Sequence, residues 1–314
     1  MKKIYIILFL GNLLWIQNGF SQKFISEEVF IPSYDSLKLS GTLFLPKKNI
    51  EHLPLAIIIA GSGPTDRDGN NAMMTNNSLK YLAEGLTKNK IATFRYDKRA
   101  IGKSLSASIK EDNLRFEDYI KDAEAIIRHF KGDSRFSSIT VVGHSEGSLI
   151  GMIASNMAEA DKYVSISGVA KTADHILKEQ LRLQFGSKTI NPILDSLKQG
   201  YTVTDLGKLS SLFRPSVQPY MISWFKYDPQ EEIARLSIPI LILQGDNDIQ
   251  VGVKEAELLK KAYPNAEYEV ISKMNHILKI IDGDMNANLK SYYQEDIPVS
   301  KELIKLISKF ILKK

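Results

Sequence analysis

Hydrophobic residues fall into two kinds of run along this chain, and these runs predict alternating strands and helices. Short apolar runs rich in β-branched residues and bounded by turn formers are typical of strands buried within a sheet. Segments with apolar residues three or four apart are typical of surface helices. The predicted strands are residues 27–32, 37–46, 55–60, 91–96, 139–142, 163–167, 238–244 and 267–272. The predicted helices are residues 78–89, 116–130, 253–262 and 301–314, with one more directly after the strand at 139–142.

The order of these elements predicts an α/β fold. Strands that alternate with helices form a mostly parallel, doubly wound sheet with helices on both faces. The first two strands are separated only by the turn-rich residues 32–36, which predicts a hairpin. Residues 171–230 break the alternation, because they are helical in pattern and contain Pro215 and Pro219. We therefore expect a helical cap of about 171–230 inserted between two strands.

The first residues have a different pattern. A basic start at residues 1–3 precedes an apolar run at 4–16 and the small-residue exit Gly-Phe-Ser at 19–21. This order is typical of a secretory signal peptide, which we place at residues 1–21. The run is shorter than the roughly 20 apolar residues of a membrane-spanning helix. We expect an exported protein, periplasmic or secreted, with no stable membrane insertion after cleavage; an uncleaved N-terminal anchor is the alternative.

Composition removes several other classes of function. The chain has no cysteine, which excludes disulfides, thiol catalysis, cysteine metal sites and a lipid-modified cysteine. The formal net charge of +5 falls to +3 when the two lysines of residues 1–21 are removed, and this charge is too small and dispersed to indicate a nucleic-acid partner. Lysines alternate with apolar residues in 301–314, which predicts a closing amphipathic helix rather than a membrane-binding one.

Residues 143–147 read Gly-His-Ser-Glu-Gly, between a predicted strand and a predicted helix. This context is typical of a nucleophile elbow, in which a sharp turn presents the serine at the carboxyl end of a sheet. Glycine at 143 and 147 keeps side chains away from that turn. The alternative is a glycine-rich turn that merely contains a serine, and the flanking strand and helix favour the elbow. Ser145 is therefore the predicted nucleophile.

A serine hydroxyl needs a base to accept its proton. His276 follows the strand at 267–272 and so lies at the carboxyl end of the sheet, where ligands bind in open α/β folds. The other histidines are disfavoured by position. His52 lies in a polar loop, His129 on a helix surface and His175 in the cap. His144 is adjacent to Ser145, but consecutive residues at such a turn point apart. His276 is the predicted base.

An acid should orient that base and stabilise its charged form. Asp248 is preferred because it follows the strand at 238–244 and the Gly-Asp-Asn turn aims it back toward the sheet. Asp246 is the alternative, with a turn hydrogen bond as its other role. Two aspartates that follow the histidine are weaker candidates, namely Asp282 and Asp284.

The tetrahedral intermediate of acyl transfer needs two N–H donors for its oxyanion. The backbone N–H of Glu146, directly after the nucleophile, is one. The tight Gly-Ser-Gly-Pro loop after the strand at 55–60 supplies the other, from Ser62 or, as the alternative, from Gly63.

Five motifs together resemble a known superfamily. They are Ala-Gly-Ser-Gly-Pro at 60–64, Asp-Lys-Arg-Ala-Ile-Gly-Lys-Ser at 97–104, Gly-His-Ser-Glu-Gly at 143–147, Gly-Asp-Asn-Asp-x-x-Val at 245–251 and Met-Asn-His at 274–276. The chain resembles serine hydrolases of the α/β-hydrolase superfamily, and its loop at 61–70 resembles bacterial esterases near the dienelactone hydrolase and serine aminopeptidase-like groups. The order Ser145, Asp248, His276 is the one expected of that fold.

This resemblance implies that residues 22–314 form an α/β-hydrolase domain with a three-layer core, a Ser-Asp-His triad, no cofactor and often esterase activity on short acyl chains. Two departures affect substrate range rather than the triad. Ala60 stands where relatives commonly have His, and Ala100 replaces the first Gly of Asp-x-Arg-Gly-x-Gly.

Some polar and aromatic residues have two interpretations. Arg67, between Asp66 and Asp68, either binds an acidic substrate group or fixes the loop through an ion pair. Glu146 either faces the cleft or only favours the helix N-terminus by its charge. The aromatic residues of 212–225 either line an acyl pocket or pack the cap onto the core.

The sequence thus predicts an exported serine hydrolase that cleaves a small-molecule ester or acyl substrate through an acyl-enzyme. A serine peptidase or acyl-aminopeptidase with the same triad is the alternative, and a catalytically silent binding protein of the same fold is the alternative from another class. No His, Asp or Glu cluster has the spacing of a metal site. Acyl chain length and oligomeric state stay open.

Overall fold

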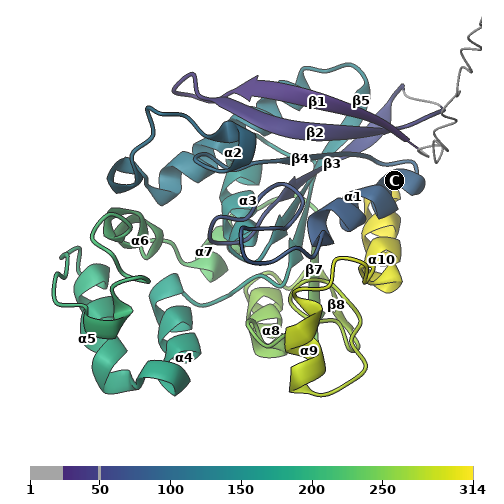
Figure 1. Ribbon diagram of the computed structural model, residues 1–314. Coiled ribbons are helices and arrows are strands. Elements are labelled where there is room, and N and C mark those ends of the chain that lie inside the picture. The colour runs from purple at the N-terminus through teal and green to yellow at the C-terminus, as the bar shows by residue number, and fades with distance from the viewer. Residues whose placement is uncertain (1–23, 49–50, 314) are drawn as a thin grey trace, which may run out of the picture.

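The structure is a computed structural model that describes residues 24–48 and 51–313. The predicted signal peptide lies outside these residues. In the described chain, eight strands form one sheet in the order β1-β2-β4-β3-β5-β6-β7-β8 (Figure 1). The strands are β1 (Phe24–Pro32), β2 (Lys38–Pro46), β3 (Leu53–Ile59), β4 (Ala92–Tyr96), β5 (Phe136–His144), β6 (Lys162–Ile166), β7 (Ile240–Gly245) and β8 (Glu267–Ile271).

The pairing of the strands confirms the predicted mostly parallel sheet. The hairpin strand β1 pairs antiparallel with β2, and β2 pairs antiparallel with β4. All other neighbours are parallel, so the carboxyl ends of β3, β5, β6 and β7 meet at one edge of the sheet. In open α/β sheets that edge is where ligands bind.

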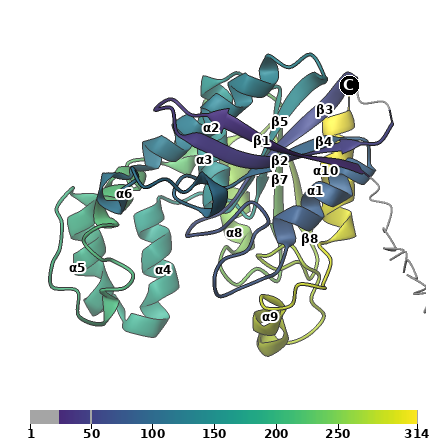
Figure 2. The ribbon, with the colours of Figure 1, turned by 45° about the horizontal axis from the view of Figure 1, so that its top comes forward.

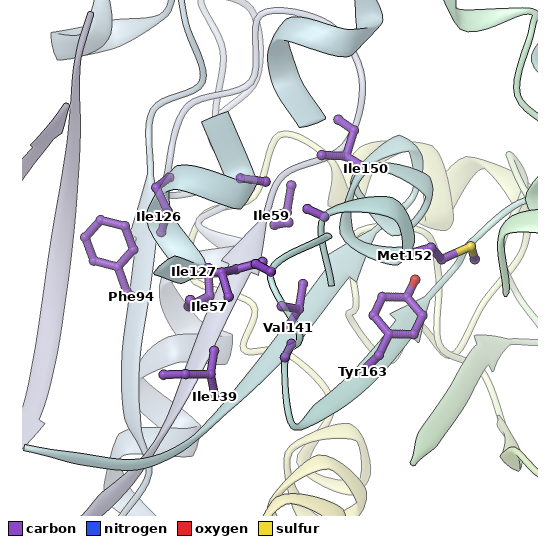
Figure 3. Close-up of a cluster of buried hydrophobic side chains, with 14 of the residues drawn as sticks. Ile57, Ile59, Phe94, Ile126, Ile127, Ile139, Val141, Ile150, Met152 and Tyr163 are labelled. Carbon is purple, nitrogen blue, oxygen red and sulfur yellow. The ribbon is translucent and has the colours of Figure 1, made fainter. Parts of the chain in front are cut away.

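Alternate residues of the central strands enter two separate cores. Ile57 and Ile59 of β3 belong to the core on one face, whereas Ile58 belongs to the core on the other. Figure 3 shows part of the first core, where Ile57, Ile59 and Val141 of β3 and β5 gather with the helix residues Ile127 and Ile150. Burial on both faces explains why the sequence shows these strands as continuous apolar runs.

Helices cover both faces, as the alternating pattern predicts. Leucines of α1 (Ser78–Lys88) and α10 (Lys301–Leu312) fill the core on one face. The other face is covered by α2 (Phe116–Lys131), α3 (Glu146–Met157) and α8 (Val253–Ala262). The short α7 (Pro229–Ala234) packs against α3 and α8.

Between β6 and β7, the chain forms helices that lie to one side of the sheet (Figures 1 and 2). Apart from α7, the α-helices of this stretch are α4 (Ala173–Phe185), α5 (Ser187–Lys198) and α6 (Gln218–Trp224). They have a small core of their own, which includes Ile190, Leu194, Phe213 and Phe225. We call α4, α5 and α6 the inserted helices.

The remaining helices are short. The 3₁₀ helices are Gly102–Ser104, Glu111–Asn113 and Gly207–Leu209, and α9 (Met285–Ser291) follows β8. The hydrophobic pattern along the chain did not predict α9. No helix of the described residues combines the length and apolar character needed to cross a bilayer.

Candidate active site

Ser145 stands at the turn between β5 and α3 in a strained conformation. Its φ of 55° and ψ of −123° are unusual for a residue with a side chain. The turn needs glycine on both sides. A Cβ on Gly143 would lie 2.4 Å from the carbonyl oxygen of Gly147, and one on Gly147 would lie 2.4 Å from that of Ile59. Close packing of the elbow on β3 therefore fixes the position of Ser145.

Asp248 and His276 are joined by a hydrogen bond. The His276 Nδ1–H donates to Asp248 Oδ2 over 2.8 Å, because a carboxylate oxygen only accepts. Asp248 Oδ1 accepts the backbone N–H groups of Gln250 and Val251 at 2.8 and 2.9 Å. Burial alone would raise the pKa of Asp248, but His276 and these N–H groups lower it overall. Asp248 is thus held as an anion, and the Nε2 of His276 is left as the basic nitrogen.

The structure brings Ser145 and His276 to one cavity. Both line a hollow of about 180 Å³ at the carboxyl edge of the sheet. Within the described residues, no hydrogen bond joins the two side chains. Catalytic contacts of this kind are often loose without substrate.

The other candidate aspartates have different partners. Asp246 accepts the backbone N–H of Lys273 over 2.5 Å. Asp282 pairs with the Lys273 ammonium at 2.9 Å, and Asp284 caps α9 through the N–H of Ala287. Asp248 is therefore the carboxylate that contacts His276.

The loop after β3 lies against the nucleophile. A Cβ on Gly61 would lie 3.0 Å from Ser145 Cβ. The backbone N–H groups of Ser62 and Glu146 have no acceptor in the described part of the chain. Both donors are thus available for a bound anion. Gly63, the alternative donor, has a φ of 75° and lines the same cavity.

A second cavity of about 660 Å³ also reaches Ser145. Its walls come from the loop after β3, from Lys98 after β4, and from the inserted helices α4 and α6. Apolar side chains dominate the part under the inserted helices, namely Ala173, Ile176, Leu177, Val217, Met221 and Trp224. Among the aromatic residues of 212–225, Trp224 lines this cavity and also packs onto the core, since its ring stacks on Phe116 of α2 with ring centroids 5.9 Å apart.

The two carboxylates that line the larger cavity have hydrogen-bond partners. Glu146 accepts a hydrogen bond from the hydroxyl of Tyr220, and burial beside Glu146 raises the pKa of this tyrosine. Glu111 accepts hydrogen bonds from Arg214 and Ser216. Glu146 therefore faces the cleft, which was one of its two predicted roles.

Arg67 and its neighbours face the sheet instead. Arg67 pairs with Asp97 at 2.7 Å, and Asp68 pairs with Arg95 at 2.8 Å. Asp66 accepts the backbone N–H groups of Asp68 and Asn70. Neither cavity is lined by Asp66, Arg67 or Asp68, which favours loop fixation over substrate contact.

Two residues of the site escaped the sequence analysis. His144 Nε2–H donates to the backbone carbonyl of His276 over 2.8 Å. Lys98, which is 3% exposed, donates from Nζ to the carbonyl of Gly61 over 2.5 Å. The one available signal was the place of Lys98 just after the carboxyl end of a strand. In the described chain, no group of three His, Asp or Glu side chains has the arrangement of a metal site.

Comparisons with known proteins identify the family of this chain. The family model described as serine aminopeptidase, S33, matches residues 74–230. Esterase EstD of Thermotoga maritima is 27% identical over 286 residues, covering 88% of this chain and 66% of that protein. The chain thus spans just under two thirds of that relative's length.

Solved structures show the same fold. Est1E of Butyrivibrio proteoclasticus with bound ferulic acid has a TM-score of 0.61 at 21% identity, covering 91% of this chain and all of that one. The Pyrococcus furiosus esterase Pf2001 has a TM-score of 0.60 at 18% identity, covering 92% of this chain and 91% of that one. At these identities the likeness establishes the α/β-hydrolase fold.

Proposed function

Since the chain belongs to the serine aminopeptidase S33 family of α/β-hydrolases, we propose that it is an exported serine hydrolase that cleaves small carboxylic esters. The observation that carries the proposal is the hydrogen bond between Asp248 and His276 at the cavity that also holds the strained Ser145. Two of these relatives are named esterases, EstD and Pf2001, which supports ester rather than other acyl substrates.

In this mechanism Ser145 Oγ attacks the ester carbonyl while His276 Nε2 accepts its proton. Asp248 stabilises the imidazolium that forms. The N–H groups of Ser62 and Glu146 bind the oxyanion. His276 then gives the proton to the leaving alkoxide, which departs as an alcohol. Water, deprotonated by His276, attacks the acyl carbon, and collapse of the second intermediate releases the acid and restores Ser145.

The two cavities support an orientation for the ester. The leaving oxygen must receive a proton from His276, and His276 lines only the smaller cavity. The alcohol therefore belongs in the cavity of about 180 Å³ and the acyl chain in the cavity of about 660 Å³. Ferulic acid, bound by one structural relative, is an acid whose esters make a useful test substrate.

The family's description names an aminopeptidase, and peptide cleavage by the same residues is the second candidate. An aminopeptidase needs a carboxylate to bind the substrate's ammonium group. The carboxylates that line the larger cavity, Glu111 and Glu146, already bind Arg214 and Tyr220. Among the described residues, this cavity is thus left without an unpaired acid, which favours esters.

The test is hydrolysis of a p-nitrophenyl ester series, from acetyl to long acyl chains, and of methyl ferulate by purified residues 22–314. Ser145→Ala should lose several orders of magnitude in kcat. Ser187→Ala, at an exposed serine of α5, is the matched control and should equal the parent. Activity that survives Ser145→Ala contradicts the assignment. An inert parent, with peptides also uncleaved, favours the silent fold.

Export has its own test. The support is the leader pattern of residues 1–21, so the protein recovered outside the cytoplasm should begin after Ser21. A full-length chain that stays inside the cell contradicts export and leaves the chemistry untouched.

A further inference from the structure

Lys98 is a buried cation whose hydrogen bond goes to a backbone carbonyl. It follows β4 by two residues and is 3% exposed. Its Nζ donates to the carbonyl oxygen of Gly61, and its ammonium lies 5.7 Å from the ring centre of Tyr119. In the described chain, no carboxylate lies within ion-pair distance of this ammonium; Glu146 acts on it only through space. Burial of a charge without an ion-pair partner costs free energy, so we looked for a function that Lys98 performs at this position.

The carbonyl that Lys98 holds shares a peptide unit with a predicted oxyanion donor. The C=O of Gly61 and the N–H of Ser62 belong to one planar group. No peptide bond among the described residues is cis, so this C=O and N–H point in opposite directions. Fixing the oxygen toward Lys98 therefore fixes the hydrogen of Ser62 toward the other side.

The same peptide borders the nucleophile and the cavity. Gly61 lies against Ser145, and Lys98, Ser62 and Ser145 all line the larger cavity. The Ser62 N–H has no acceptor in the part of the chain that the structure describes. The Ser62 N–H is therefore a free donor, and Lys98 fixes its direction by binding the carbonyl of the same peptide. Preorganised oxyanion binding requires a donor that is free and fixed in this way.

We propose that Lys98 is a positioning residue of the oxyanion hole, holding the Gly61–Ser62 peptide so that its N–H faces the substrate oxyanion. The proposal rests on the proposed esterase function. The ammonium also polarises the peptide it contacts, which strengthens the N–H as a donor. Its charge further favours the negative oxygen that develops in the transition state.

Glu146 fits the same arrangement. Its backbone N–H is the second oxyanion donor, and its carboxylate balances the Lys98 charge through space. Burial lowers the pKa of Lys98, and Glu146 opposes that shift. Tyr220 holds the carboxylate by a hydrogen bond. Lys98 thus holds the peptide of one donor, and Glu146, whose N–H is the other donor, acts on the Lys98 charge through space.

The experiment compares Lys98→Met and Lys98→Arg with the parent. It measures kcat and KM on the best p-nitrophenyl ester and the Ki of a matching trifluoromethyl ketone, whose hemiketal oxygen occupies the oxyanion site. Lys98→Met should lower kcat/KM about 10- to 100-fold through kcat, since loss of one complete oxyanion donor costs about 10²- to 10³-fold. Ki should rise by the same factor while KM stays nearly constant. Lys98→Arg should recover part of both losses.

Controls separate positioning from folding. Titration with a fluorophosphonate counts competent sites, and kcat is given per competent site. Lys103→Met removes an exposed lysine of the same loop, paired with Glu28, and should match the parent. If Lys98→Met does not fold, Lys98→Met/Glu146→Gln removes both buried charges and should show the same rise in Ki.

The results distinguish this proposal from the one it rests on. A folded Lys98 variant with parental Ki and kcat per competent site overturns the positioning role alone, as does a loss confined to the number of competent sites. A parent without esterase activity, or activity that survives Ser145→Ala, overturns both.

Discussion

His144 and His276 lie with ring centres 4.8 Å apart but have opposite protonation requirements. In the proposed mechanism His276 becomes positively charged, so a second charge beside it would oppose catalysis. Burial, and next the charge of His276, lower the pKa of His144 to about 3. His144 therefore stays neutral and acts through its N–H, which binds the carbonyl of His276 and fixes the backbone of the base.

This neutrality predicts acid sensitivity. The folded pKa of His144 is about 3 and its ordinary value is 6.5. Between these limits the unfolded chain binds a proton that the folded chain does not, so the free energy of unfolding falls as the pH falls. In His144→Gln the pH slope should be smaller by up to about 1.4 kcal/mol per pH unit. Urea unfolding from pH 4.5 to 7.5 measures this slope. An unchanged slope, equal to that of the surface control His129→Gln, contradicts a buried neutral His144.

The residues that sequence reasoning found and missed differ in the nature of their partners. Ser145, Asp248 and His276 each follow a predicted strand, so the fold pattern alone brought them to one edge. His144 and Lys98 bind backbone carbonyls that lie 132 and 37 residues away. A carbonyl is present at every position, so no residue type in the sequence marks it as a partner.

At the scale of elements, α6 is attached to the core at three points. Tyr220 donates to Glu146 of α3, and the N–H of Phe116 at the start of α2 donates to Ser223 over 2.7 Å. Trp224 stacks on the ring of Phe116. These contacts place α6 over the nucleophile and make it a fixed wall of the larger cavity.

Removal of the first contact should destabilise the protein. Tyr220→Phe leaves the buried carboxylate of Glu146 without its donor, which should lower the free energy of unfolding by about 1–3 kcal/mol. Urea unfolding of Tyr220→Phe, Glu146→Gln and the double variant gives the coupling energy between the two residues. Tyr201→Phe, at a tyrosine that is 67% exposed, is the control. A coupling energy near zero contradicts the attachment.

Element boundaries were predicted with uneven success. The helix expected at residues 253–262 is α8 (Val253–Ala262). The strand expected at 139–142 is longer, Phe136–His144, because its first residues are half exposed and polar serines break the apolar run. The seven residues of α9 are too few to show helical periodicity. Asp284, considered as a catalytic acid, begins that helix instead.

At the scale of the molecule, Ser145 lies where two differently built cavities meet. The inserted helices give the larger cavity an apolar wall under α4 and α6. The smaller cavity has polar side chains at its wall, among them Asn71, Asn76 and Tyr292. The insertion between β6 and β7 therefore makes one side of the nucleophile large and suited to an apolar acyl chain, whereas the other side is smaller and lined by both polar and apolar residues.

This asymmetry predicts selectivity between isomeric esters. Methyl heptanoate and hexyl acetate have the same atoms, so their overall hydrophobicity is similar, but only the first places its long chain in the acyl group. We expect kcat/KM to be about 10- to 100-fold higher for methyl heptanoate. Its acyl group carries five more methylenes than that of hexyl acetate, and each methylene that enters an apolar pocket contributes about 1 kcal/mol. The expected ratio is smaller than the full sum because some of these methylenes remain solvated. Leu177→Trp, which narrows the larger cavity, should reduce this preference, because acetate esters do not reach that wall. Equal rates on both isomers would contradict the predicted difference between the two cavities, and a preference for hexyl acetate would mean that the acyl chain occupies the smaller cavity. The leaving alcohol would then lie away from His276, which must protonate it, so reversal would contradict the proposed geometry of the whole site.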